Sequence, residues 1–258
     1  MSSALTELIQ GQLRDSACYV PHTWHQGRTV FGGLSAAMSL ANAMRLVPSP
    51  ALKLRTAQIS FVGPVGAEIR IGSQVLRQGR TMTTVATDLV SGSALGVRSV
   101  FAFGEDRQTS IVHDSYPRIP ANRPSEYAPQ HNGGQVAEFL RNFDIRPAGG
   151  SQPFSGSSNP EITWWMKHRH ADGLDPVLAL VTMADALPPA AATLVAGEAP
   201  LSSVNWSFDL AGAPCGDWFL LRSTSEQACN GYSTQRMDVW DESGRRVLSG
   251  RQTVAIFA

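Results

Sequence analysis

The sequence predicts an α+β fold in which one unit, a central helix followed by a curved antiparallel sheet, occurs twice. Two segments have the composition of helices that are apolar on almost every side: FGGLSAAMSLANAM (31–44) and LDPVLALVTMADALPPA (174–190). Four strand-like segments follow each of them. A helix that is apolar all round must be enclosed, so we expect each sheet to wrap around its own helix, with the two sheets joined side by side.

Capping residues predict where the helices begin and end. The first helix has the pair Gly32-Gly33 at its start, and the prolines of VPSP (47–50) end it. In the second, Asp175 has the N-cap position and Pro176 the first helical position. The proline pair 188–189 is the expected stop, so the second helix is predicted to continue through residues 180–187.

The strand-like segments indicate an antiparallel meander in each unit. Ile69, Ile71 and Val75 alternate with polar residues, as expected for a half-buried strand. The turn signals SGSALG and DESG lie between the third and fourth strands of the two sets. The sets can be aligned, with RSVFAF (98–103) on QTVAIF (252–257). This alignment pairs Arg98 with Gln252 and supports an internal repeat.

A segment rich in proline, asparagine, serine and charge separates the two units. We therefore predict an N-terminal unit over residues 1–104, a linker over 105–134 and a C-terminal unit over 135–258. A short helix over residues 3–13 opens the first unit. A strand pair, VAEFLRNFDIRP and EITWWMKHRH, opens the second before its helix.

Composition excludes several classes of protein. Basic and acidic residues both number 21, so no overall positive charge favours nucleic acid. No apolar run is long enough for a membrane span, and the N-terminus lacks the features of a signal peptide, which predicts a cytoplasmic protein. Three cysteines at unrelated spacings indicate neither a zinc site nor a disulfide framework. Neither a P-loop nor G-x-G-x-x-G follows a strand, and we expect no cofactor.

Asp185 is the residue that the helix pattern leaves unexplained. Burial of an ionised carboxylate costs roughly several kcal/mol unless the group is paired with a cation or hydrogen-bonded. Thr182 lies three residues earlier, on the same helix face. The matching positions of the first helix are Ser39 and Asn42, so only the second helix carries a group that can act as a base. A structural carboxylate paired with an arginine is the alternative.

Two polar residues on distant strands complete a candidate site. Gln252 shares a strand face with apolar residues, and Ser203 opens the strand after the second helix. If these strands flank the helix, both side chains converge on Asp185. Ser202, one residue away, points to the opposite face and is the competing hydroxyl. Alternatively, the Gln252 amide only bridges strands.

Gly32 and Gly33 allow backbone amides at a helix N-terminus to approach a ligand such as a carbonyl oxygen. Close packing of helix against strand is an equally good reading of the two glycines. We treat Gly32, Gly33 and Thr182 as candidate substrate-binding residues.

These motifs together resemble the double-hotdog acyl-CoA thioesterases of the thioesterase II type. The resemblance is carried by GRTVFGG, by the acid on the second helix, by the serine before VNWSF and by the glutamine in SGRQTVAIF. It implies a tandem hotdog fold, an acyl-CoA substrate and a water activated by Asp185, Ser203 and Gln252, without metal or cofactor. Serine stands where that family commonly has threonine. The resemblance also allows further association into a homo-oligomer.

Two other functions on this fold stay open from sequence. A non-catalytic acyl-CoA or acyl-chain binding protein would bind without turnover. A hotdog hydratase or dehydratase would need a histidine near the thioester, and neither central helix has one. A serine hydrolase is disfavoured because G-x-S-x-G does not occur. His168 and His170 could share a strand face as metal ligands, but a basic surface cluster is the favoured reading.

Overall fold

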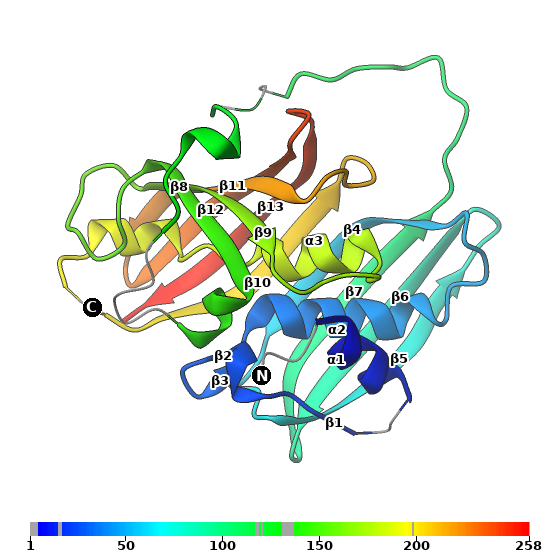
Figure 1. The fold of residues 1–258 in the computed structure, drawn as a ribbon. Helices are drawn as coiled ribbons and strands as arrows, with labels where there is room; N and C mark the ends of the chain where they lie inside the picture. Colours follow the sequence, from blue (N-terminus) through cyan, green and yellow to red (C-terminus); the bar gives the residue numbers. More distant parts are fainter. Residues whose placement is uncertain are drawn as a thin grey trace.

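The fold is described by a computed structural model over residues 5–14, 17–116, 119, 121–130, 137–197 and 199–257 (Figure 1). The elements of the first half are α1 (Leu5–Arg14), β1 (Cys18–Tyr19), η1 (His22–Trp24), β2 (His25–Gln26), β3 (Thr29–Val30), α2 (Gly32–Met44), β4 (Lys53–Phe61), β5 (Glu68–Gln78), β6 (Met82–Ser91) and β7 (Ala94–Gly104). The first helix was predicted over 3–13, of which residues 3 and 4 lie outside the described residues.

The elements of the second half follow a long connection. They are η2 (Pro124–Glu126), η3 (Glu138–Asn142), β8 (Phe143–Gly150), β9 (Glu161–His168), α3 (Pro176–Ala184), η4 (Ala190–Leu194), β10 (Leu201–Leu210), β11 (Trp218–Cys229), β12 (Tyr232–Asp241) and β13 (Arg246–Ile256). The predicted strand VAEFLRNFDIRP (136–147), of which residue 136 lies outside the described residues, was partly wrong, because its first part forms the 3₁₀ helix η3. The predicted four-strand meander was partly wrong. Strands β5-β6-β7 and β11-β12-β13 are consecutive neighbours, but β4 pairs with β7 and β10 pairs with β13.

The strands form one continuous antiparallel sheet in the order β1-β5-β6-β7-β4-β10-β13-β12-β11-β9-β8. The two sheets predicted from the repeat are thus hydrogen-bonded to each other through β4 and β10 at the centre. Trp206 of β10 lies opposite Ile59 of β4 on one side and opposite Gln252 of β13 on the other. The pairing of β4 with β10 therefore defines which residues of the two halves have equivalent positions in the sheet.

Helices α2 and α3 lie next to each other on the inner face of the sheet (Figure 1). Helix α2 packs on β5, β6 and β7, and α3 packs on α2 and β9. The helices approach closely because Gly33 has no side chain: a Cβ there would meet the Thr182 carbonyl oxygen and the Phe31 ring. The start of α2 and the end of α3 are thereby brought together.

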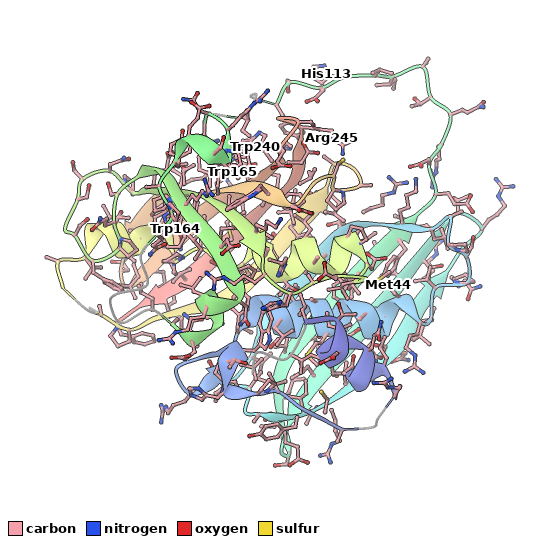
Figure 2. The ribbon with its side chains drawn as sticks, in the orientation of Figure 1. Met44, His113, Trp164, Trp165, Trp240 and Arg245 are labelled. Atoms are coloured by element: carbon pink, nitrogen blue, oxygen red, sulfur yellow. The ribbon has the colours of Figure 1, made fainter. Side chains whose placement is uncertain are left out.

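The connection between the halves packs on the outer face of the second half. Trp165, Leu220 and Trp240 form a small core there, against which Ile119 and Tyr127 pack. The labels in Figure 2 show Trp165 and Trp240 near each other on this side, while His113 lies on the part of the connection that stands away from the sheet. The described part of the predicted linker is irregular apart from η2. Residues 117, 118, 120 and 131–134 of it lie outside the described residues.

Among the described residues, no helix combines the length and the apolar character that a membrane span requires.

Candidate active site

Asp185 lies immediately after α3, because the helix ends at Ala184. The prediction that the helix continues to the proline pair was wrong. The last turn is closed by the Ala186 N–H, which donates to the Met183 carbonyl at 2.8 Å. Asp185 itself has φ −92° and ψ 6°, a sparsely populated conformation in which active-site residues are often found. Pro188 limits the helix in two ways. Its ring would clash with the Ala184 carbonyl in a continued helix, and it disfavours the helical conformation of the preceding residue.

The start of α3 has the predicted cap. Asp175 is the N-cap residue and its carboxylate accepts a hydrogen bond from the Val177 N–H at 2.8 Å, with Pro176 at the first helical position. The cap fixes where the helix begins, and the helix then runs from Pro176 to Ala184, so that Asp185 is the first residue after it.

Two neutral donors hold the Asp185 carboxylate. Gln252 Nε2 donates to Asp185 Oδ1 at 2.9 Å, and the Gly33 backbone N–H at the start of α2 donates to the carboxylate as well. Among the described residues Asp185 makes no ion pair. Burial raises the pKa of Asp185 to about 7, while the bonds from Gln252 and Gly33 oppose that rise. The side chain keeps partial contact with solvent. Such a carboxylate can exchange a proton near neutral pH.

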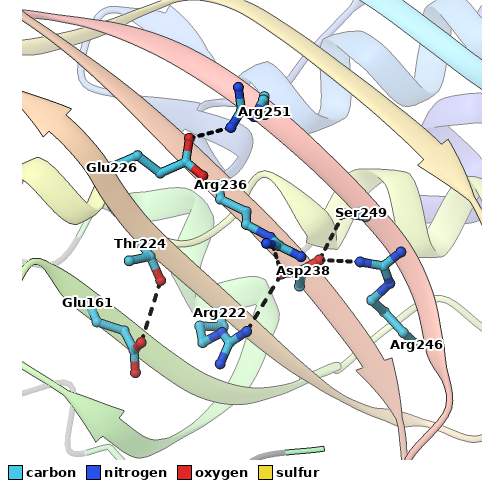
Figure 3. Close-up of polar contacts among 9 residues, drawn as sticks. All are labelled: Glu161, Arg222, Thr224, Glu226, Arg236, Asp238, Arg246, Ser249 and Arg251. Carbon is cyan, nitrogen blue, oxygen red and sulfur yellow. Dashed lines mark hydrogen bonds and ion pairs between the residues drawn. The ribbon is translucent and has the colours of Figure 1, made fainter. Parts of the chain in front are cut away.

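A second buried acid shows what a purely structural carboxylate looks like in this protein (Figure 3). Asp238 faces the outer side of β12 and is 2% exposed. It accepts from Arg236 at 2.9 Å, from Arg246 at 2.9 Å and from the Ser249 hydroxyl at 2.8 Å, and Arg222 lies at 3.7 Å. Three guanidinium groups therefore lie around the Asp238 carboxylate. Asp185 has only amides, which leave its proton exchangeable.

The two glycines at the start of α2 serve Asp185 and the packing around it. A Cβ at Gly32 would lie 2.6 Å from Asp185 Oδ2 and 3.1 Å from the Phe61 ring. The carboxylate therefore occupies the space that a side chain at residue 32 would need. Gly33 permits the contact with α3 described above, and its N–H is already engaged by Asp185.

Gln252 lies on the inner face of β13 and is 5% exposed. Ser203 pairs with Val254, which lies two residues after Gln252 on β13. Ser203 and Gln252 therefore face the same side of the sheet. A bulge between Ser203 and Asn205 shifts the register there. Ser202 pairs with Ala255 and faces outward. The structure thus brings Ser203 and Gln252 to one face, but within the described residues no hydrogen bond joins Ser203 to Asp185 or to Gln252.

Thr182 is fully buried, and its hydroxyl donates to the Leu178 carbonyl of its own helix at 2.8 Å. Thr182 and Asp185 were predicted to share a helix face. Among the described residues, no hydrogen bond joins their side chains. The hydroxyl of Thr182 is therefore committed to α3.

The pairing of Arg98 with Gln252 is corrected by the strand register. Ile59 and Trp206 lie opposite each other at the centre, and their next neighbours on the inner face are Ser99 and Gln252. Ser99 is fully buried, whereas Arg98 is exposed on the outer face and forms a 2.7 Å ion pair with Asp88. The sequence alignment was one residue out of register, and a shift of one residue moves a side chain to the other face of a sheet.

The reading of His168 as part of a surface cluster was wrong. Its Nε2 lies 2.8 Å from the Ala179 carbonyl, and burial lowers the pKa of His168 to about 4. A neutral His168 donates to the carbonyl and ties β9 to the middle of α3. No group of three or more potential metal ligands occurs among the residues with described positions.

Comparisons with known proteins agree with this fold. A family model named acyl-CoA thioesterase C-terminal domain matches residues 120–256, and one named acyl-CoA thioesterase N-terminal domain matches residues 20–104. A search of curated proteins gives no match.

Three solved structures illustrate the likeness. A hot dog fold protein of unknown function from Alicyclobacillus acidocaldarius has a TM-score of 0.81 at 19% identity, with 94% of this chain and 92% of that chain covered. A proposed thioesterase II from Thermobifida fusca has a TM-score of 0.80 at 21% identity, with 94% and 92% covered. The TesB protein of Mycobacterium avium subspecies paratuberculosis has a TM-score of 0.78 at 16% identity, with 98% of each chain covered. The chain therefore has a hotdog fold.

Proposed function

Because the chain belongs to the acyl-CoA thioesterase family that these models describe, we propose that it hydrolyses an acyl-CoA thioester to the free acid and CoA. The observation that carries the proposal is the Asp185 carboxylate, which is held by amides and has a pKa of about 7. A general base works best when its pKa lies near the working pH. We assign Asp185 the role of base, and Gln252 and Ser203 the role of positioning the water.

In the proposed reaction Asp185 accepts a proton from water while the water oxygen bonds to the thioester carbonyl carbon. The tetrahedral intermediate then expels the sulfur as the C–S bond breaks, and the proton held by Asp185 passes to the leaving thiolate. Atoms and charge balance without a metal or a cofactor. The Gln252 amide keeps Asp185 Oδ1 in one orientation, which leaves the other carboxylate oxygen for the water.

The architecture that accompanies this function is the double hotdog. We propose that residues 1–104 and 135–258 are the two hotdog units, connected by 105–134, and that the single active site uses the end of α3 and the start of α2. Gly32 is proposed to line the substrate site at the helix start. Cytoplasmic location, a role in lipid metabolism and assembly into a homo-oligomer stay predictions from the sequence.

The test is release of free thiol from a series of acyl-CoA substrates of increasing chain length. Asp185→Asn keeps the size and one acceptor of the side chain but cannot take a proton, so kcat is expected to fall about 10²- to 10⁴-fold. Asn42→Ala, at the corresponding position of the first half, is the matched control and should retain activity.

Three outcomes would contradict the proposal. Binding of acyl-CoA with no turnover at any chain length would indicate a binding protein instead. Turnover unchanged in Asp185→Asn would remove the assignment of the base. Formation or loss of a carbon-carbon double bond in the acyl group without thiol release would identify a hydratase or dehydratase.

A further inference from the structure

Gln235 is a buried glutamine directly opposite Gln252. The two residues are paired across β12 and β13, so their side chains share the inner face of the sheet. Gln235 is 0% exposed. Directly opposed residues of an antiparallel pair have Cβ atoms about 5 Å apart. The Gln235 amide therefore lies next to the pair formed by Gln252 and Asp185.

The hydrogen bonds of Gln235 define how its amide group is oriented. Oε1 accepts from the Ala190 backbone N–H, and also from the Ser223 hydroxyl at 3.1 Å. A backbone N–H can only donate, so the atom that faces Ala190 must be the oxygen. The nitrogen is therefore the other end of the amide, and Nε2 has no hydrogen-bond partner among the described residues.

An unpaired buried donor is unfavourable in the free protein, because it has lost its hydrogen bonds to water without gaining another. Ser223 lies on β11, on the side of β12 away from β13. Oε1 and Nε2 diverge from one carbon atom, so an oxygen that accepts from Ser223 turns the nitrogen away from Ser223. We infer that Nε2 then faces the side of β13. That side holds Gln252 and, beyond it, Asp185.

The donors closest to Asp185 are already engaged. Gly33 N–H and Gln252 Nε2 both donate to the carboxylate. Hydrolysis also needs a donor for the thioester carbonyl oxygen, because that oxygen gains negative charge as water adds to the carbon. A donor that is buried and unpaired before the substrate binds is suited to this role.

We propose that Gln235 is a further catalytic residue, whose Nε2 donates a hydrogen bond to the thioester carbonyl oxygen of the bound acyl-CoA. This inference rests on the proposed thioesterase function. The bond strengthens as the carbonyl π electrons move onto the oxygen and the new C–O bond forms. It weakens again when the carbonyl is restored and the C–S bond breaks. Its contribution is therefore mainly to kcat.

Kinetics of Gln235→Met test the role, with Thr87→Val as the matched control. Thr87 lies on β6 and pairs with Ser99 of β7. It has the position in the first half that Gln235 has in the second. We expect kcat of Gln235→Met to fall about 10²-fold, with KM changed less than about threefold. The pH at which activity is half maximal should not move, because the donors to Asp185 are unchanged. A shift of that pH with kcat otherwise retained would overturn the proposal and make Gln235 a positioning residue.

Gln235→Glu separates the loss of the Nε2 donor from the loss of the acceptor for the Ala190 N–H. It keeps an acceptor for Ala190 and Ser223 but, once ionised, has no hydrogen to donate. At pH 9 its kcat is expected to be at least as low as that of Gln235→Met. Wild-type kcat in this variant at pH 9 would show that Nε2 is not needed.

A measurement without turnover distinguishes failure of this inference from failure of the proposed function. Butyryl-CoA labelled with ¹³C at the carbonyl is bound to Asp185→Asn, and its carbonyl resonance is compared with that in the Asp185→Asn, Gln235→Met double variant. A hydrogen bond to the carbonyl shifts its resonance downfield, and we expect the shift to be lost in the double variant. An unchanged resonance rejects the role of Gln235 even if the wild-type enzyme is an active thioesterase. If the wild type releases no thiol, the proposed function and the catalytic role of Gln235 are both rejected, and the resonance then reports only a binding contact.

Discussion

The two halves of the molecule place similar residues on the inner face of the sheet and give them different partners. In the first half Asn42 Oδ1 accepts from the Ser73 hydroxyl at 2.7 Å, and Ser73 lies 3.1 Å from the Thr87 hydroxyl. In the second half the carboxylate of Asp185 accepts from the Gln252 amide. The first set is neutral and linked internally. The second set contains a group that can gain and lose a proton.

The same comparison holds one strand further from the centre. Ser99 and Thr87 of the first half correspond to Gln252 and Gln235 of the second. Hydroxyls are short and stay close to the sheet, whereas glutamine amides extend toward the helices. The comparison teaches that one fold supplies two equivalent positions, and that side-chain length and charge decide which of them can carry out chemistry.

After loss of the acid itself, the largest effect should come from removing the amide that holds it. Gln252→Met is expected to lower kcat/KM about 10²-fold, because the carboxylate loses its orientation and one of the two bonds that favour its charged form. The same loss should move the rising part of the pH profile to higher pH. Ser99→Ala, the matched change in the first half, should alter activity less than about twofold. Equal effects of the two variants would show that Gln252 has only a structural role.

The second prediction concerns the pH dependence of the wild-type protein. Burial raises the pKa of Asp185 to about 7, and the base must be deprotonated to act. Activity should therefore rise about tenfold per pH unit below pH 7 and level off above it. Stopped-assay rates of thiol release between pH 5 and pH 9 would measure this. A plateau that extends down to pH 5 would contradict the assigned base.

The smallest effect should come from giving the first half a carboxylate. Asn42→Asp places a charge beside two hydroxyls with no amide donor, and should reduce the free energy of unfolding at pH 8 by about 1–3 kcal/mol. Activity should not change. In the double variant with Asp185→Asn it should not return, because the first half has no counterpart of the two glutamine amides. Denaturant unfolding and thiol release check both expectations. Recovery of turnover in the double variant would mean that the carboxylate alone is sufficient.

Much of the fold could be predicted from sequence because it depends on apolar patterns. The two helices that are apolar on every side, the cap at Asp175 and the four strands that follow each helix are all properties of local segments. The pairing of β4 with β7 and of β10 with β13, in place of a simple meander, depends on contacts between distant segments. The family was also identified correctly from motifs and their order. The end of α3 was missed because alanine and leucine, which favour helices, continue past Asp185, while the constraint from Pro188 acts backward along the chain.

The parts that could not be predicted depend on register and burial. Arg98 and Ser99 are neighbours, and only hydrogen-bonded pairing shows which of them faces inward. Gln235 lies in the polar run YSTQRM, whose alternation is masked because both faces carry polar side chains. His168 follows a lysine and precedes an arginine, so its burial against α3 is invisible in the composition.

The hydrogen bond from Gly33 to Asp185 joins residues from opposite halves of the chain. The acid of the second unit is complete only when the first unit supplies its helix start. A lone unit of this kind would have to borrow that start from a separate molecule, at a concentration set by expression. Here the covalent connection places one Gly33 donor in the same molecule as each Asp185.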